Sequence, residues 1–473
     1  MIKVSSLTKA FALLLCTCVS GLGQVPNPKA LVQPATEANP TPNSQGSTKD
    51  RPLSLQTATD LLLENNLAVV AARYNVDILR AQRIAAGLRP HSNLTFSATQ
   101  FTIPRVFKNP SEFFTTNQEN GAANTSYTLE VDQLIERGNK RQLRISQADL
   151  NTQAAEAQVK DALRQQIFQL RQAFFTAVLA RENVRVLKEN LDQFGRTENL
   201  LIVQVKEGYS AGVDLKRVQL QRLQFQSDVS NAQQTYQQSL RDVFNLIGTG
   251  DRASFADSSL IPTGTPSSLP GLDASLEVLE GTLDIIPTLL WIDNLRRLAL
   301  ENRPDVKAAE LSFKAAEQGL ALAEAQRARD ITLGGQYSRN GSDNTVGVVV
   351  GLPIGTRRFT NAAIAQATAA KLQAQAQLRL VRNQALTDVE KAFTAYNVSR
   401  EKLQLFTGGA LNTAADVRHI EEIAYRDGAK GLLDYLDAQR TYNQTLVDYN
   451  QARFDFLMSL YQLELATGTT IVK

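Results

Sequence analysis

The feature that most limits the fold of this chain is a helical pattern that runs unbroken from about Asn139 to Val205. Apolar residues recur along it at heptad spacing, as at Leu163, Leu170 and Phe174. At about 1.5 Å of rise per residue the helix is on the order of 100 Å long, which exceeds the thickness of any bilayer. It is also rich in Gln, Arg, Asp and Glu. We therefore expect it to stand in water, packed against other helices.

The same order of parts occurs twice along the chain. Residues 62–90 align without gaps with residues 299–327, and the turn "EGYSAG" at 207–212 recurs as "IAYRDG" at 423–428. Each half reads as a helix, two alternating segments, a very long helix, a glycine turn and another long helix. This order indicates an internal tandem repeat.

Two segments in each half alternate apolar and polar residues with a period of two. They lie at 91–103 and 125–135 in the first half and at 331–338 and 344–354 in the second. Strands of about ten residues with one apolar and one polar face suit a transmembrane barrel, and they equally suit a soluble β-sandwich. The long helices favour the barrel.

Four strands cannot close a barrel, and an unpaired strand edge is not tolerated in lipid. A membrane location would therefore require a homotrimer, whose three copies supply twelve strands. We expect a mainly helical fold with a small transmembrane β portion: four strands per protomer in a twelve-stranded outer-membrane β-barrel, above coiled-coil helices that form a periplasmic α-barrel.

The first residues predict export. Residues 1–23 combine basic residues, a short apolar run and small residues, as a signal peptide does. Cys16 and Cys18, the only cysteines, lie inside it, so the mature chain has no thiol unless one of them becomes a lipidated N-terminus. Residues 24–52 are rich in Pro, Asn, Ser and Thr, which predicts a disordered tether.

The remaining divisions follow from the repeat. The first repeat covers 53–248, a Pro-, Gly- and Ser-rich linker covers 249–286, the second repeat covers 287–468, and a short tail covers 469–473.

Composition excludes several functions. With 50 basic and 47 acidic residues the chain lacks the charge footprint of a nucleic-acid-binding protein. The two histidines, His91 and His419, are far apart in sequence, so we expect no metal site and no cofactor. No nucleophile, base and orienting group recur together, which argues against an enzyme. The main rival to a channel is a periplasmic or surface coiled-coil spacer, but a spacer does not need the four strands.

Several motifs together resemble those of the TolC-like outer membrane efflux proteins, over about Leu53 to Gly468. They are the openings "ENNLAV" and "ENRPDV", the segment "GLPIGTRR" after the fourth strand, the turns "YSAG" and "YRDG", and the closures "LIG" and "LATG". The resemblance implies a passive exit duct in the outer membrane lipid that works with a periplasmic adaptor protein and an inner-membrane transporter. It leaves drugs, heavy metals and secreted proteins open as cargo.

The resemblance also places both glycine turns at a periplasmic tip. Asp434 and Asp437 match, in their spacing from Gly428, two family aspartates that lie one helical turn apart. Since positions i and i+3 share a helix face, three protomers would stack two rings of carboxylates and favour cations. The alternative is that both are ordinary aspartates near a helix N-terminus, which the helix dipole also favours.

Two further roles follow from the resemblance. Tyr425 and Lys430 occupy the positions of the tyrosine and the basic residue that hold the family's tip closed. An ungapped alignment puts Val218 at the position of the locking aspartate, and Asp214 is the nearest substitute. Small residues of the turns should let the adaptor's helical hairpins approach closely, although a helix-ending glycine explains them as well. These residues are Gly212, Val213, Gly428, Ala429 and Gly431.

A basic cluster follows the second strand. It consists of Arg137, Lys140, Arg141 and Arg144, and we expect it to anchor the periplasmic rim of the barrel.

Overall fold

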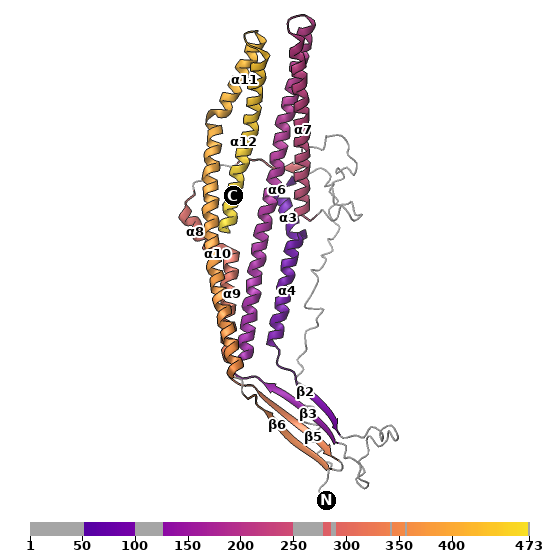
Figure 1. Cartoon of the computed structure of the whole chain (residues 1–473), viewed down its shortest axis with the longest axis vertical. Helices are drawn as coiled ribbons and strands as arrows, with labels where there is room; N and C mark the ends of the chain where they lie inside the picture. Colours follow the sequence, from indigo (N-terminus) through magenta and orange to yellow (C-terminus); the bar gives the residue numbers. More distant parts are fainter. Residues whose placement is uncertain are drawn as a thin grey trace, which may run out of the picture. The chain divides into compact units, whose positions relative to one another are not determined.

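The computed structural model describes residues 52–99, 126–248, 278–284, 290–340, 343–354 and 357–471. The expected signal peptide, nearly all of the tether and most of the linker lie outside the described residues. The chain divides into a unit Met1–Ser47 and a unit Thr48–Lys473. All of the described residues belong to the second unit (Figure 1).

The described residues are mostly helical. The first half contains β1 (Leu53–Ser54), α3 (Leu55–Asn65), α4 (Leu67–Gly87), β2 (Asn93–Thr99), β3 (Ser126–Ile135), α6 (Lys140–Lys206) and α7 (Gly212–Leu246). The second half contains β4 (Leu279–Glu280), α8 (Ile292–Asn302), α9 (Pro304–Ala325), β5 (Ile331–Asn340), β6 (Asp343–Gly351), α10 (Arg357–Leu405), the π-helical segment η3 (Phe406–Ala410), α11 (Leu411–Arg426) and α12 (Leu432–Thr467). The long helix expected over 139–205 is α6, with 67 residues.

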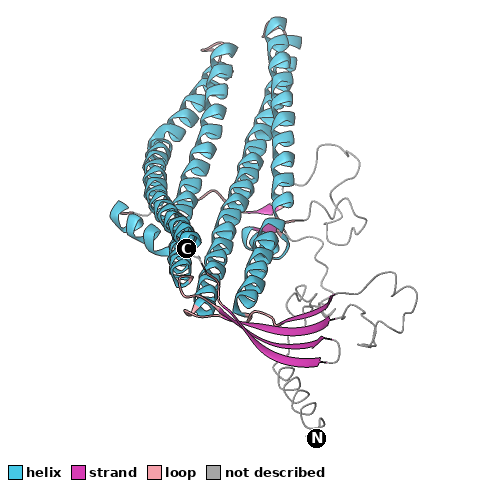
Figure 2. Cartoon of the chain, turned by 60° about the horizontal axis from the view of Figure 1, so that its bottom comes forward, coloured by secondary structure: helices cyan, strands magenta, loops and turns pink. Residues whose placement is uncertain are grey.

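The four alternating segments form the expected strands. They make one antiparallel sheet in the order β2-β3-β5-β6, which lies as a single layer beyond the ends of the helices (Figure 2). Leu129 stands opposite Phe96 on one side and opposite Tyr337 on the other, so the apolar positions share one face. On this face Leu94, Phe96, Val346, Val348 and Val350 are exposed. The sheet therefore has one apolar face, and no other part of the described chain covers it.

The expected linker is not entirely without regular structure. Its described part includes β4, which pairs in parallel with β1 at the start of the first half, Leu279 opposite Leu53. No helix among the described residues is long and apolar enough to span a bilayer.

Helix packing centres on α6, which contacts α4, α7, α9 and α12 (Figure 1). Phe174 and Leu170 of its heptad pattern are fully buried, in a core with Tyr236 of α7 and Leu457 of α12. A second core joins α8, α10 and α12. At its centre the ring of Tyr396 packs at a tilt against the ring of Phe456. The heptad stripes are therefore core positions, as their spacing predicts.

The expectation of one unbroken helix before the second turn was wrong at one point. Helix α10 ends at Leu405, and η3 separates it from α11. Within η3, Gly409 has φ 135° and ψ −15°, a conformation that side chains with a Cβ rarely adopt. The adjacent pair Gly408 and Gly409 therefore explains why the helix bends here.

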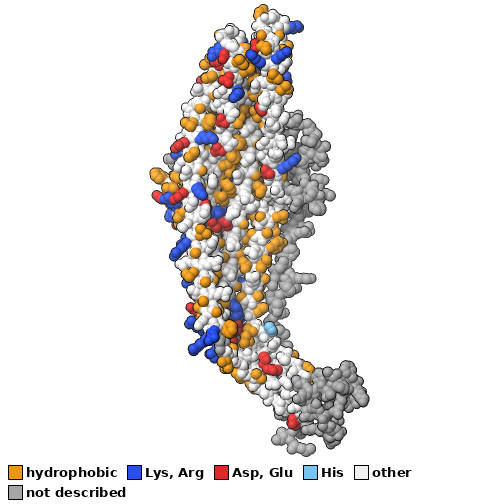
Figure 3. Space-filling model, in the orientation of Figure 1, with side chains coloured by type: hydrophobic (Ala, Val, Ile, Leu, Met, Phe, Trp, Pro, Cys, Tyr) orange, Lys and Arg blue, Asp and Glu red, His pale blue; other side chains and the backbone are white. Residues whose placement is uncertain are grey.

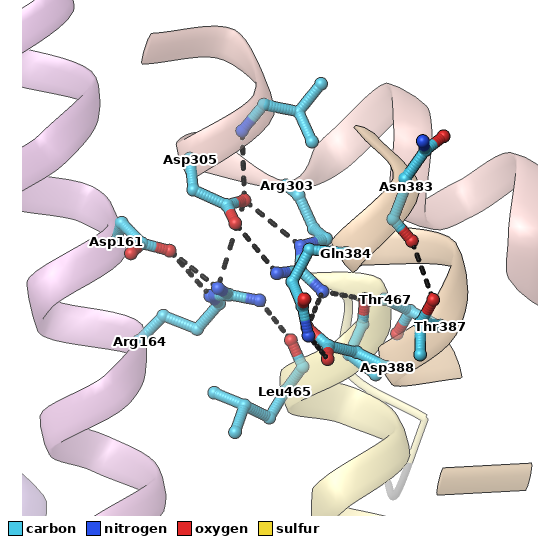
Figure 4. Close-up of polar contacts among 12 residues, drawn as sticks. Asp161, Arg164, Arg303, Asp305, Asn383, Gln384, Thr387, Asp388, Leu465 and Thr467 are labelled. Atoms are coloured by element: carbon cyan, nitrogen blue, oxygen red, sulfur yellow. Dashed lines mark hydrogen bonds and ion pairs between the residues drawn. The ribbon is translucent and has the colours of Figure 1, made fainter. Parts of the chain in front are cut away.

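A buried cluster of ion pairs joins the two halves (Figure 4). Arg303, whose side chain is 5% exposed, donates hydrogen bonds to both oxygens of Asp305 at 3.0 and 2.7 Å and to Asp388 at 3.0 Å. Arg164 of α6 donates to Asp161 and lies 4.0 Å from Asp305. Burial acts to raise the pKa of Asp305, but the hydrogen bond and charge of Arg303 outweigh it and hold that pKa below its usual range. The cluster fastens α6, α9 and α10 at one level.

Each half has a side chain that ties its first helix pair to the end of its last helix. Asn66, between α3 and α4, donates to the carbonyl oxygen of Leu246 at 3.1 Å. Arg303, between α8 and α9, donates to the carbonyl oxygen of Ala466 at 3.3 Å. Asn66 also accepts hydrogen bonds from the first amides of α4 and thereby caps that helix.

Candidate functional site at the helix tips

The two helix pairs end in turns built on glycine. Gly208 follows α6 with φ 82°, and Gly428 follows α11 with φ 73°. In the second turn the amide of Ala429 donates to the carbonyl of Ala424 at 2.8 Å. A left-handed glycine at this point satisfies the last carbonyls of the helix and reverses the chain. The sequence therefore fixes where both tips lie.

The tips are joined by apolar side chains. Tyr425 of α11 stacks on Tyr435 of α12, with ring centroids 5.7 Å apart and planes 7° from parallel. Both contribute to a cluster that links α6 and α7 with α12: Phe194, Leu201, Val218, Phe225, Leu432 and Tyr435 are buried in it. Burial raises the pKa of Tyr425, and the negative charge of Asp214 raises it further. Tyr425 and Asp214 are thus near enough for the charge of one to act on the other.

The charged residues of the expected lock pair within their own helix pairs. Lys430 donates to Glu421 of α11 at 2.5 Å, and this hydrogen bond raises the pKa of Lys430. Asp214 accepts from Arg217 one turn along α7, at 3.4 Å. Val218 is fully buried in the apolar cluster, so this position offers no carboxylate to Lys430.

Sequence reasoning missed Glu421 and Tyr435. Glu421 precedes Lys430 by nine residues, and only the fold of the turn brings them together. Tyr435 could have been found, because its position beside Asp434 on the buried side of an amphipathic helix start is visible in the sequence.

Asp434 and Asp437 lie exposed on one face of α12, while Leu432, Tyr435 and Ala438 are buried on another. Asp434 accepts a hydrogen bond from the amide of Gly431 at 3.3 Å, as an acidic residue in the first turn of a helix commonly does. Asp437 has no hydrogen bond or ion pair with another described residue. The capping role thus accounts for Asp434 but not for Asp437.

The small residues proposed for adaptor contact are all at the surface of the tips. Gly212, Val213, Gly428, Ala429 and Gly431 are exposed. A Cβ on Gly212 or Gly428 would meet no other atom within 4 Å, so neither glycine is required by packing. No group of side chains in the described part of the chain could hold a metal ion.

Comparison with known proteins gives the class of this fold. The model of the family "Outer membrane efflux protein" matches residues 295–469. The cobalt-zinc-cadmium resistance protein CzcC of Cupriavidus metallidurans is 25% identical over 408 residues, which cover 84% of this chain and 86% of CzcC. The outer membrane protein TolC of Vibrio cholerae is 22% identical over 337 residues, which cover 68% of this chain and 72% of TolC.

The solved structure of the outer membrane protein VceC from Vibrio cholerae has the same fold. Its TM-score is 0.67 at 19% identity, over 88% of this chain and 97% of VceC.

The matching family model is that of outer membrane efflux proteins, and TolC and VceC are outer membrane proteins. These matches confirm the resemblance to the TolC-like outer membrane efflux proteins that the motifs of the chain show.

Proposed function

We propose that the chain is one protomer of a trimeric, passive exit duct that crosses the outer membrane and projects into the periplasm. In this proposal a signal peptide exports the chain, and the duct operates with a periplasmic adaptor protein and an inner-membrane transporter that supplies the energy. The observation that carries the proposal is the four-stranded sheet with an exposed apolar face, in a chain whose residues 295–469 match the outer membrane efflux protein family.

The sheet supports a trimer because it is open. Strands β2 and β6 are its two edges, and each has one side without a hydrogen-bonded partner in the sheet. Unpaired edges are not tolerated in lipid. Three copies joined edge to edge would give a closed barrel of twelve strands, with α6, α7, α10, α11 and α12 of each copy continuing it as an α-barrel.

The two repeats, 53–248 and 287–468, are part of this proposal. The contacts of Asn66 and Arg303 support them. These two residues align between the halves, and each donates a hydrogen bond to a carbonyl at the end of the last helix of its own half. The helix ends also turn alike: Gly248 and Gly468 have φ 76° and 72°. Three copies of a duplicated chain would make an approximately six-fold tube.

We further propose that Asp434 and Asp437 form two carboxylate rings at the narrow periplasmic end. Their exposure on a shared face supports this, as does the lack of a described partner for Asp437. Tyr425, Lys430 and Asp214 would hold the tip closed, and the exposed small residues of the turns would receive the adaptor. Closely spaced rings of carboxylates attract cations and give sites at which a multivalent cation can lodge.

The test is single-channel conductance of the full chain in planar bilayers. Wild type is compared with Asp434→Asn/Asp437→Asn and with Asp448→Asn, an exposed aspartate on the same helix three turns from Asp437. We expect cation-selective steps that trivalent cations block from the periplasmic side in wild type and Asp448→Asn, and a block that is lost in the double variant.

Two other results would change the proposal. Conductance with unaltered block in the double variant would place the constriction elsewhere. Absence of conductance, together with release from membranes by urea or high salt without detergent, would favour the coiled-coil spacer.

A further inference from the structure

The four connections between sheet and helices lie at one edge of the sheet. Because the strands are antiparallel, this edge holds the start of β2, the end of β3, the start of β5 and the end of β6. Each connection, or the first turn of the helix that follows it, carries at least one exposed arginine. We call these residues the arginine collar: Arg89, Arg137, Arg327, Arg329, Arg357 and Arg358.

Two acidic side chains at this level, Glu136 and Asp330, are already engaged by other basic residues. Glu136 accepts two hydrogen bonds from Arg144, at 2.5 and 2.9 Å, which hold the pKa of Glu136 below its usual range. Asp330 accepts from Lys140 at 2.8 Å. Arg141 donates to the carbonyl of Gly87. Three members of the basic cluster expected at the rim are therefore used inside the chain.

The collar, by contrast, has uncompensated charge. None of its six guanidinium groups makes a hydrogen bond or ion pair with another described residue. Figure 3 shows Lys and Arg side chains gathered, on the face in view, where the helices meet the sheet. Six unpaired cations along one edge of a sheet require an anionic partner or bulk water.

Exposed apolar side chains continue from the sheet into the collar. Leu352 and Ile354 follow β6 at the same alternate positions as its exposed valines, and Ile354 is 91% exposed. Phe359, directly after Arg357 and Arg358, is 81% exposed. An aliphatic stretch followed by arginines and an aromatic ring is typical of a segment at the boundary between hydrocarbon and headgroups.

We propose that the arginine collar binds the phosphate groups of anionic phospholipids in the periplasmic leaflet of the outer membrane. This inference rests on the proposed function, because the apolar sheet face must lie in lipid for the collar to meet headgroups. The planar guanidinium group matches phosphate with two parallel hydrogen bonds, and its stem can lie along apolar surface. The collar thereby fixes the depth of the sheet in the bilayer.

The experiment measures lipid retention by the full chain in nanodiscs and by native mass spectrometry. The probes are dioleoyl-phosphatidylglycerol and dioleoyl-phosphatidylcholine, which share acyl chains and differ in charge. Wild type is compared with Arg357→Gln/Arg358→Gln. The control, Arg241→Gln/Arg440→Gln, removes the same charge from exposed helix positions away from the sheet.

We expect wild type and the control to retain phosphatidylglycerol in preference to phosphatidylcholine. In the collar variant the ratio of retained phosphatidylglycerol to phosphatidylcholine should be about 30-fold lower. The preference should also fall as salt rises. Arg357→Lys/Arg358→Lys should recover part of it, because lysine keeps the charge without the bidentate geometry.

Equal retention of both lipids by wild type, or the same loss in the control as in the collar variant, would overturn the proposal. The proposed function is tested separately by conductance in bilayers of phosphatidylcholine alone. Conductance there without a lipid preference would refute the collar and keep the channel, whereas failure to insert or conduct would refute both.

Discussion

Replacing Arg303 should loosen the junction between the halves far more than replacing an exposed arginine. Its guanidinium group is nearly fully buried and bonds to Asp305, Asp388 and the carbonyl of Ala466. Removing one partner of a buried ion pair costs about 3–5 kcal/mol, because the other charge stays buried without compensation. Asp305 and Asp388 are 25% and 32% exposed, so water recovers part of this loss. We therefore expect Arg303→Met to cost about 3 kcal/mol of local stability.

Hydrogen exchange followed by mass spectrometry measures this locally. A loss of about 3 kcal/mol corresponds to roughly a hundredfold faster opening of the amides near Arg303 and at the end of α12. Arg297→Met is the matched control, since Arg297 pairs with Glu301 on the surface, where both side chains are more than half exposed. We expect its effect to stay within about 0.5 kcal/mol. Equal exchange in Arg303→Met and wild type at neutral pH would refute the reasoning.

The pH dependence gives a second check on the same variant. In wild type the pKa of Asp305 is depressed, so its stabilising effect is present above the ordinary carboxylate pKa and is lost as pH falls through the depressed value. Without Arg303, burial dominates and the pKa of Asp305 should rise above its ordinary value. The difference between variant and wild type should therefore be large at neutral pH and shrink below about pH 4. A difference that grew on acidification would contradict the assigned cause.

Two further predictions concern the tip and the bend in the helix. Lys430→Ala removes the ion pair with Glu421 and should raise the conductance of the closed channel, as should Glu421→Gln; an unchanged conductance would argue against a role in closure. Gly409→Ala forces a Cβ into φ 135° and should cost about 1–3 kcal/mol of local stability, whereas Gly408→Ala, at a helical position, should cost nothing or stabilise slightly. Hydrogen exchange over 405–415 measures both, and equal effects would show that the bend does not depend on the left-handed glycine.

Much of the fold is predictable because its signals are periodic and local. The alternation in 125–135 and 331–338 depends only on neighbouring residues, and both segments are strands. Helix α6 could be bounded to within a residue at each end, since heptad spacing continues through it and a glycine follows at Gly208.

The bend at η3 was not predictable in the same way. A glycine within a helical pattern lowers helix stability by only about 1 kcal/mol relative to alanine, so most such glycines remain helical. Gly408 does remain helical while Gly409 does not, although a Cβ on either residue would meet no other atom within 4 Å. The difference is decided by how α11 must lie against α12, which is a tertiary constraint.

The candidate site shows a similar limit. The glycine turns and the exposed face with Asp434 and Asp437 follow from local pattern. The partner of Lys430 does not, because the fold of the hairpin brings Glu421, nine residues earlier, next to it. The partners of Arg303 are likewise hidden, since Asp388 lies 85 residues away in sequence.

The tips of the two halves differ in how firmly they are held. At its tip α6 buries Phe194 and Leu201, whereas α11 contains no buried residue and is set off from α10 by the bend at Gly409. Segments with few buried apolar contacts open at lower free energy than well-packed ones. The stack of Tyr425 on Tyr435 is one of the contacts that hold α11 against α12. Under the proposed function, the half that carries Asp434 and Asp437 is therefore also the half whose tip is least costly to move, and we expect opening to begin at α11 rather than at α6.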